Sequence, residues 1–453
     1  MQGQLDTLVE LRKWNRAARL RDAFDKQTPD YVWLGKNKKY SDDQLTLDIN
    51  RGWALMYENR LRDAEAYWQQ LYEKAPANLE IRNGRAYLHS WRGWPRQAEE
   101  DFNIVASMDP NYKASKPGRI VVKNALADKE SAREEAMALY KQQPHDKWTQ
   151  ILIRELVIEE KNSNRLESNY IAEDDGSRDW RVRDEADTPL SLYTRLQAMY
   201  AMRRTWNDED DDSEAIYLRR AGLGLNHIFN RDWSARQMFS VSTEDGKEFG
   251  SATEVGWTPD DHWRVEGLYD SFSTDVAHRA RRNGVTAKKA ELSADYRESE
   301  WRKYRGNISR QFYSDDNERD ELNLGYEQNL FVKNDWRMRV FAELYGSRNS
   351  AWDNPAIDYY NPKYVWSASL TNMTEQTLID IYEDYFAHRL YITLGMQKQC
   401  DYKEQLIHAI KYEHEYTFSH TNALVWNIEY RDTYYDDDRT GSFAINLIWN
   451  MRF

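Results

Sequence analysis

The sequence lacks long hydrophobic runs and has almost no cysteine. No segment approaches the run of about 20 apolar residues that a membrane-spanning helix needs. Cys400 is the single cysteine, so the chain has no internal disulfide framework and no cysteine-rich metal cluster. These absences exclude a helical membrane protein and a disulfide-bonded scaffold.

Acidic residues outnumber basic ones. The chain has 63 Lys and Arg against 76 Asp and Glu, which gives a net charge of −13. A nucleic-acid-binding protein needs a basic stripe, so we expect no nucleic-acid partner. The acidic balance permits a cationic one.

The first residues show no export signal. Met1, Gln2, Gly3 and Gln4 lead straight into helical sequence, without the basic and apolar segments of a signal peptide. An exported protein must begin with such a signal. If this protein is exported, we expect the sequence to be N-terminally truncated.

Aromatic residues are abundant, with 30 Tyr and 18 Trp. Tyr and Trp are enriched at membrane–water interfaces. In the last strand-like run the apolar positions alternate with mostly polar ones: Phe443, Ile445, Leu447, Trp449, Met451 and Phe453. Successive side chains of a strand point to opposite faces, so this segment has one continuous apolar face.

The same period of two recurs through the C-terminal two-thirds of the chain, for example in 263–272, 322–332, 336–345 and 423–434. Short polar turns alternate with longer inserts such as 273–289 and 347–363. This pattern predicts an antiparallel transmembrane β-barrel of about 14 to 16 strands over residues 161–453. A soluble β-sandwich would need a second buried layer over the aromatic face, which this composition does not offer.

The first third has a different period. Pro76, Pro110 and Pro144 recur every 34 residues, and further positions repeat in the same register: Ala64, Ala98 and Ala132; Leu71, Val105 and Leu139. This is the tetratricopeptide period, in which each repeat is a helical hairpin. We therefore expect an α-solenoid over residues 1–160, in a domain separate from the barrel, with a concave binding groove.

The domain order and one insert point to a known family. Helical repeats precede a barrel whose insert reads Asn-Ser-Ala-Trp-Asp-Asn-Pro at 349–355 and Asp-Tyr-Tyr-Asn-Pro at 358–362. The chain thereby resembles the poly-β-1,6-N-acetyl-D-glucosamine export porins of the PgaA/HmsH type. The resemblance implies a 16-stranded outer-membrane barrel with repeats in the periplasm. Its implied partners are partly deacetylated poly-N-acetylglucosamine, a periplasmic deacetylase lipoprotein and outer-membrane lipid.

Alternation also predicts which side chains face the lumen. The candidates for guiding a cationic polymer are Glu266, Asp270, Asp295, Glu327, Glu343, Tyr345 and Glu429. The alternative is that such carboxylates form ion pairs with arginines of the barrel wall; Arg339 beside Glu343 and Arg431 beside Glu429 favour this structural role for those two. A register slip of one residue would invert every assignment. In the predicted external insert, the candidate residues are Trp352, Asp353, Tyr359 and Tyr360.

No catalytic, metal or cofactor site is predicted. His408, His414 and His420 share a strand face, but steps of six residues separate neighbours by roughly 20 Å. We therefore expect a transporter that is not an enzyme. The competing hypotheses are a tetratricopeptide interaction scaffold that transports nothing, and a barrel that exports another polysaccharide such as cellulose or alginate.

Overall fold

A computed structural model describes residues 4–453 except 5, 6, 10, 209–214, 244–246, 277, 334, 382 and 436, with only the backbone of 278 and 282. The chain divides into two compact units, Met1–Ile153 with Phe331–Trp336, and Arg154–Leu330 with Arg337–Phe453. Among the helices described, none combines the length and the apolar character needed to cross a membrane.

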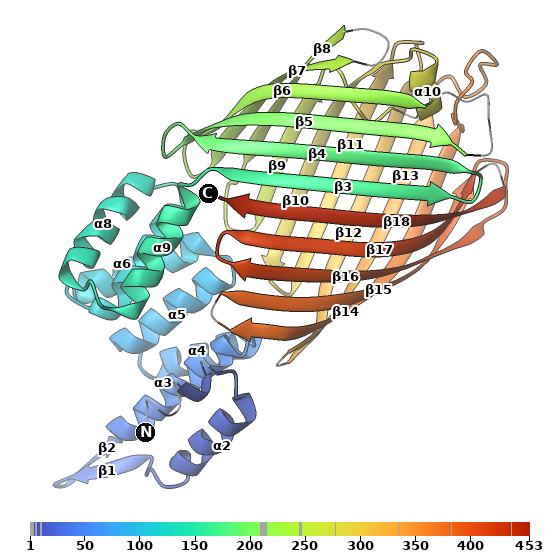
Figure 1. Cartoon of the computed structure of the whole chain (residues 1–453). Helices are drawn as coiled ribbons and strands as arrows, with labels where there is room; N and C mark the ends of the chain where they lie inside the picture. The colour runs from blue at the N-terminus through green and yellow to red at the C-terminus, as the bar shows by residue number, and fades with distance from the viewer. Residues whose placement is uncertain are drawn as a thin grey trace. The chain divides into compact units, whose positions relative to one another are not determined.

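The N-terminal unit consists of helices and one small hairpin (Figure 1). In the described part of the chain, the elements before the barrel are, in order, α2 (Trp14–Asp25), β1 (Tyr31–Leu34), β2 (Asn37–Tyr40), α3 (Asp42–Tyr57), α4 (Leu61–Lys74), α5 (Leu79–Trp91), α6 (Pro95–Met108), η1 (Lys113–Ser115), α7 (Lys116–Ala125), α8 (Lys129–Gln142) and α9 (Lys147–Glu159), and α9 crosses the division between the two units.

The helical hairpins follow the predicted period. Helices α4, α6 and α8 begin at Leu61, Pro95 and Lys129, each 34 residues after the one before. The repeated alanines Ala64, Ala98 and Ala132 are fully buried. Their small side chains let paired helices approach closely, so the sequence repeat is also a packing repeat.

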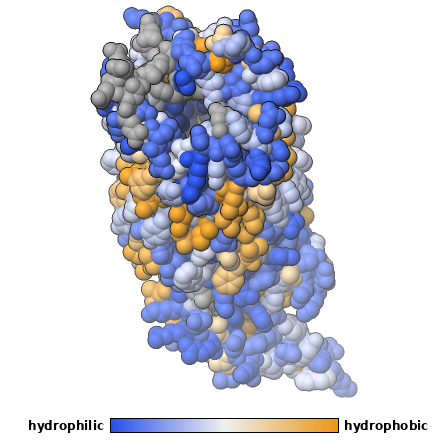
Figure 2. All heavy atoms as spheres, turned by 90° about the vertical axis from the view of Figure 1, so that its right-hand side faces the viewer, coloured by the Kyte–Doolittle hydropathy of each residue, from blue (hydrophilic) through white to orange (hydrophobic). Residues whose placement is uncertain are grey.

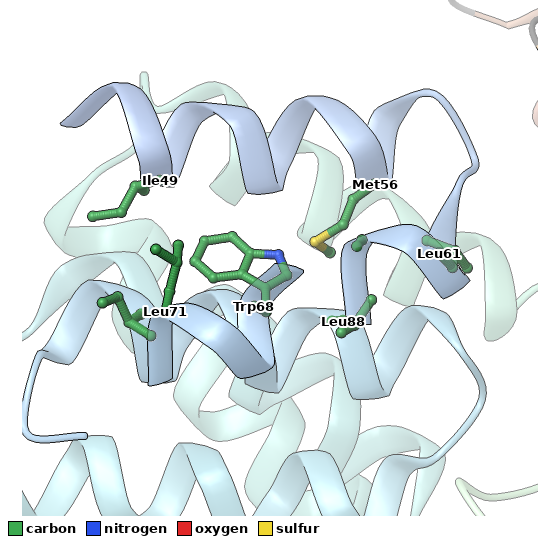
Figure 3. Packing of buried hydrophobic residues seen from close by; sticks show 8 residues of the cluster. Ile49, Met56, Leu61, Trp68, Leu71 and Leu88 are labelled. Carbon is green, nitrogen blue, oxygen red and sulfur yellow. The ribbon is translucent and has the colours of Figure 1, made fainter. Parts of the chain in front are cut away.

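Trp68 is the largest fully buried side chain among the described residues. Its indole is 0% exposed and lies among apolar side chains of α3, α4 and α5 (Figure 3). A Cβ atom at Gly52 or Gly84 would clash with this ring. The lack of a side chain at these two glycines therefore leaves the space that the tryptophan ring occupies. Phe102 occupies the corresponding place one repeat later, where Gly118 takes the role of Gly84.

The C-terminal unit is a closed antiparallel barrel (Figure 1). Sixteen strands are found in the described part of the chain: β3 (Ser163–Glu173), β4 (Ser177–Pro189), β5 (Thr194–Asn207), β6 (Ile216–Ile228), β7 (Trp233–Thr243), β8 (Lys247–Trp257), β9 (Trp263–Asp270), β10 (Ala287–Ser299), β11 (Arg302–Tyr313), β12 (Glu318–Lys333), β13 (Trp336–Asn349), β14 (Tyr364–Ile381), β15 (Asp384–Gln399), β16 (Gln405–Ser419), β17 (Asn422–Tyr435) and β18 (Asp438–Arg452).

The first and last strands close the ring. Strands β3 and β18 pair from Ser163 with Arg452 to Glu173 with Ser442. The terminal Phe453 extends this ladder, because its N–H donates to the carbonyl of Asn162 at 3.0 Å and its carbonyl accepts from Asn162 at 3.1 Å. The closed ring leaves no strand edge facing lipid. The predicted fold class, a helical solenoid followed by an antiparallel barrel, is confirmed.

The two ends of the barrel differ in their connections. We call the end where β3 begins and β18 ends the closing end, and the opposite end the loop end. The two long inserts, 271–286 with the short helix α10 (His278–Arg282) and 350–363, both follow strands that run to the loop end. Both long connections therefore lie at the loop end, as in outer-membrane barrels.

Candidate functional site: the barrel lumen

The strand register separates the lumen face from the lipid face. On β9 to β12, the cross-strand rows formed by Val265, Ala294, Gly306 and Leu324, and by Gly267, Leu292, Ile308 and Leu322, are apolar. Leu292 and Ile308 are about half exposed, as expected of side chains on a lipid-facing surface. The intervening rows, which carry most of the charges, therefore face the lumen.

The structure places all seven predicted lumen residues in lumen-facing rows. Four of the carboxylates already have an arginine partner on their own strand or a neighbouring one. Arg305 Nε lies 2.9 Å from Asp295, Arg339 Nη1 lies 2.7 Å from Glu327, and Glu266 and Glu429 pair with Arg264 and Arg431 two residues away on the same strand.

Asp270 has a more distant partner near the loop end. Arg220 Nη2 of β6 lies 3.5 Å from Asp270 Oδ1, and the same guanidinium donates from Nε to Ser240 at 2.9 Å. Phe272 covers Arg220 with its ring, so this arginine is only 6% exposed. The ion pair therefore fixes the chain where β9 leaves the wall.

Glu343 differs from its neighbours. Within the described part of the chain it makes no ion pair or hydrogen bond. The expectation that Arg339 would neutralise it is wrong, because Arg339 pairs with Glu327 on β12. Four residues along one strand span about 13 Å, whereas residues opposite each other on paired strands lie about 5 Å apart.

Tyr345 is held by hydrogen bonds to charged neighbours. Its hydroxyl accepts from Arg319 at 2.8 Å and donates to Glu321 at 2.9 Å. Arg319 also pairs with Glu321 at 3.0 Å. The phenol is therefore a fixed part of the wall, with only part of its ring available to a passing molecule.

The densest charge cluster of the lumen was not predicted. Arg389 of β15 donates to Glu375 at 2.6 Å, to Glu413 at 2.9 Å and also to Glu415. Arg337 lies 3.5 Å from Glu375. The alternation of the strand-like run 389–397 is consistent with a lumen-facing side chain at Arg389. Its three partners depend on strand pairing, which sequence alternation does not reveal.

A second carboxylate that lacks a partner among the described residues was not predicted either. Glu254 of β8 lies between Arg236 and Leu268 in a lumen-facing row. Arg236 donates to Gln197 at 2.7 Å and lies 3.5 Å from Glu185, so it does not neutralise Glu254. Strand β8 has glycine, serine and threonine at several positions, and its apolar alternation is therefore weak.

The insert 350–363 has an exposed part and a buried part. Trp352 and Asp353 are exposed, and Lys363 Nζ lies 4.7 Å from the Trp352 ring centroid. Tyr359 is 8% exposed, stacks on Tyr313 at 5.8 Å and donates to Asp315 at 2.9 Å. Burial, together with the hydrogen bond to Asp315, raises the pKa of Tyr359.

Polar contacts fix the rest of this insert. Asn317, which is 1% exposed, donates to Asn361 at 2.9 Å and accepts from the Ala351 N–H at 3.1 Å. Tyr360 donates to Gln399 at 2.9 Å. Of the four predicted residues, Tyr359 and Tyr360 therefore hold the insert together, and Trp352 and Asp353 face outward to solvent.

The lumen offers weak, repeated polar contacts. No group of three or more His, Cys, Asp or Glu residues suited to a metal ion occurs in the parts of the chain described above. His408 Nε2 lies 2.9 Å from Asp432, on the lipid-facing side of the wall. Alternating guanidinium and carboxylate groups can exchange hydrogen bonds with a hydrated polar chain, and each such exposed contact is weak.

Comparison with known proteins finds a matching protein family and two relatives of the chain. Residues 197–453 match the protein family described as "PgaA membrane beta barrel domain". The chain is 21% identical over 405 residues to the poly-beta-1,6-N-acetyl-D-glucosamine export proteins of Escherichia coli strain K12 and of Escherichia coli O157:H7. These alignments cover 88% of this chain and 49% of each relative, so the chain spans about half the length of those proteins.

A solved structure shares the fold. The protein titled "Bacterial polysaccharide outer membrane secretin" superposes with a TM-score of 0.59 at 18% identity, covering 65% of this chain and 99% of that one. The family match and the apolar outer face together place the barrel in the outer membrane.

Proposed function

The chain belongs to the family of the PgaA membrane β-barrel domain, and from this premise we propose that it exports poly-β-1,6-N-acetyl-D-glucosamine from the periplasm to the cell surface. The observation that carries the proposal is the alignment with export proteins for this polymer over 88% of the chain, which includes helices as well as barrel. A likeness confined to the barrel would fit a porin of any kind.

The direction of the chain through the membrane follows from its connections. The closing end, with its short turns, faces the periplasm, and the loop end faces outward. The helical unit, residues 1–160 in our division of the chain, is then periplasmic. Polymer enters at the closing end and leaves past the inserts 271–286 and 350–363.

The lumen suits a chain that carries both neutral and cationic sugars. Partial deacetylation leaves free ammonium groups on poly-N-acetylglucosamine. Glu254 and Glu343 have no ion-pair partner in the described part of the chain, so each presents an uncompensated negative charge. Paired carboxylates such as Glu266 contribute less, because their arginines compensate them. The lumen thus attracts ammonium groups at a few points and holds them loosely.

The helical unit supplies a surface for the polymer or for the periplasmic deacetylase. Aromatic rings recur there at the repeat spacing: Trp53 lies 5.3 Å from Tyr87, and Tyr57 lies 5.4 Å from Trp91. Trp91 is 39% exposed. A row of partly exposed rings stacks on sugar faces or on apolar side chains of a protein partner. We assign no catalytic function to either unit.

Export is tested in cells that synthesise the polymer but lack their own exporter. Producing this protein, with any N-terminal segment that its gene encodes, should restore polymer at the cell surface. If the protein inserts normally and all polymer nevertheless stays in the periplasm, the proposal is contradicted. Cells that make cellulose or alginate instead test the alternative cargo, and recovery of either polymer would reassign the substrate.

A further inference from the structure

A cluster of charged residues lies on the lipid-facing side of β10 to β13, close to the loop end. Arg310 of β11 is paired with Ala290 of β10 and with Asp320 of β12. The next row toward the membrane centre contains Leu292, Ile308 and Leu322, which face lipid. Arg310 and Asp320 therefore stand at the upper edge of the apolar band, on the outside of the barrel.

A single carboxylate holds two guanidinium groups side by side. Arg310 Nη2 lies 2.9 Å from Asp320 Oδ2, and Arg348 of β13 reaches the same oxygen from Nε at 2.9 Å and from Nη2 at 2.8 Å. Both arginines remain accessible, with 44% and 72% of their side chains exposed. Asp320 therefore fixes the orientation of two arginines without covering them.

The cluster retains unused donors and a positive balance. Lys288 lies two residues beyond Ala290 on the same outward face, and in the described part of the chain it makes no ion pair or hydrogen bond. Glu318 approaches Arg310 at 3.4 Å. Three cations, Lys288, Arg310 and Arg348, thus face two carboxylates in a protein whose overall charge is −13.

An apolar groove on the outer wall adjoins the cluster, and Arg310, Asp320 and Arg348 belong to its lining. It has a volume of about 990 Å³, and its lining also includes small residues such as Gly267 and Gly346. Larger apolar side chains complete the lining: Tyr269, Leu292, Ile308, Leu322 and Trp366. A second groove of about 1000 Å³ continues from Trp366 past Ala294, Gly306 and Ala368. On the face of the molecule drawn in Figure 2, hydrophobic residues gather in a patch that hydrophilic residues border, which is the general pattern of a lipid-facing surface.

We propose that this surface binds one molecule of a phosphorylated glycolipid of the outer leaflet, of the lipid A type. Its phosphate accepts hydrogen bonds from Arg310, Arg348 and Lys288, and an acyl chain fills the groove. Guanidinium pairs match the oxygens of a phosphate group. The apolar groove begins where the cations end, which is the arrangement of a lipid with a charged head. The site rests on the loop end facing outward, and it is independent of the exported polymer.

The test is lipid binding to the detergent-purified protein, measured by native mass spectrometry. Lipid A is titrated in, alongside its dephosphorylated form and phosphatidylglycerol. The R310Q/R348Q double variant should bind lipid A about tenfold more weakly, because two charge-assisted contacts are lost. A second variant fills the groove with G267L and G346L. A Cβ atom at Gly267 meets nothing within 4 Å, and one at Gly346 meets only a carbonyl oxygen at 4.0 Å. This variant should also lose binding.

The matched control is Arg439→Gln. Arg439 pairs with Asp432 at 2.6 Å on the lipid-facing side of β17 and β18, where the large side chains Tyr430 and Phe443 lie below it. The Arg439→Gln variant should leave lipid A binding unchanged. Equal binding of lipid A and its dephosphorylated form would overturn the proposal, as would a preference for phosphatidylglycerol. Full binding by both the double arginine variant and the groove variant would overturn it as well.

Discussion

Single side chains determine whether the helical unit packs. Trp68 is fully buried against Gly52 and Gly84, and no smaller residue fills the same hole. We expect Trp68→Ala to lower the free energy of unfolding of the helical unit by about 3–5 kcal/mol. The loss of stability is measured by following the helical circular dichroism signal on heating. Trp33→Ala is the control, because Trp33 is 68% exposed. A melting temperature equal to that of the control would show that the repeats do not depend on this ring.

A second prediction at the residue scale concerns pH. Burial alone would raise the pKa of Glu135, but hydrogen bonds from Lys123 and Arg119, each 2.8 Å long, outweigh it and hold the pKa below its usual value. A lowered pKa in the folded state adds stability above the pKa of the unfolded chain, and this stability is lost as the pH falls through the folded-state value. Glu135→Gln should therefore destabilise the helical unit at pH 7, by less than about 1 kcal/mol.

The same substitution should have no effect once the wild-type carboxyl group is protonated. Denaturant unfolding at neutral and at strongly acidic pH measures the difference. Glu134→Gln is the control, since Glu134 is exposed and has no partner among the described residues. An equal destabilisation by Glu135→Gln at both pH values would show that its contribution is packing and not charge.

At the scale of elements, alternation found the strands whose outward positions carry large apolar residues. The strands β13, β17 and β18 were predicted in this way. Strand β4 was not predicted, because its outward face combines the apolar Trp180 and Val182 with the charged Arg178 and Asp184. Alternation also predicts that Glu327 and Glu343 face the lumen. It does not predict that Arg339 pairs with Glu327 and not with Glu343, because this choice depends on the register between β12 and β13.

The helical unit provides the third prediction. A chain lacking the residues before about Asn162 keeps every strand of the ring, so we expect it to insert and to show heat-modifiable migration on gels. It should export polymer poorly, because the surface that receives polymer or deacetylase is missing. Secreted polymer per folded barrel is the measurement. Full export by the isolated barrel would reduce the helices to a spacer.

At the scale of the whole molecule, charge in the lumen should act collectively. Neutralising Glu266, Asp270, Glu327, Glu343 and Glu429 together should reduce export without preventing insertion. Single substitutions should do little, because attraction in a wet channel is screened by salt. Secreted polymer per folded barrel is again the readout. Glu404→Gln is the control for lost charge, since Glu404 pairs with Lys398 at 2.8 Å near the loop end and outside the lumen rows. An unchanged yield from the fivefold variant would leave Glu254 and contact with aromatic rings as the remaining means of guidance.

Orientation is the last prediction at this scale. A membrane-impermeant label applied to intact cells should react with a cysteine introduced at Trp352, in a protein whose native Cys400 has been replaced by serine. It should not reach a cysteine introduced at Glu134, an exposed position of the helical unit. Labelling of the helical unit from outside would reverse the topology and, with it, the leaflet assigned to the glycolipid.

The pairing of β3 with β18 has a consequence for the order of events during biogenesis. The ring can be sealed only after β18 has been synthesised, because β3 pairs with β18 and Phe453 hydrogen-bonds to Asn162. The contact that completes the barrel is thus among those most distant along the chain, and such contacts form slowly. Until then both strands keep unpaired edges, which invite aggregation. The barrel chain must therefore be kept unfolded in transit, and assembly should depend on helper proteins that delay folding and then bring its two ends together.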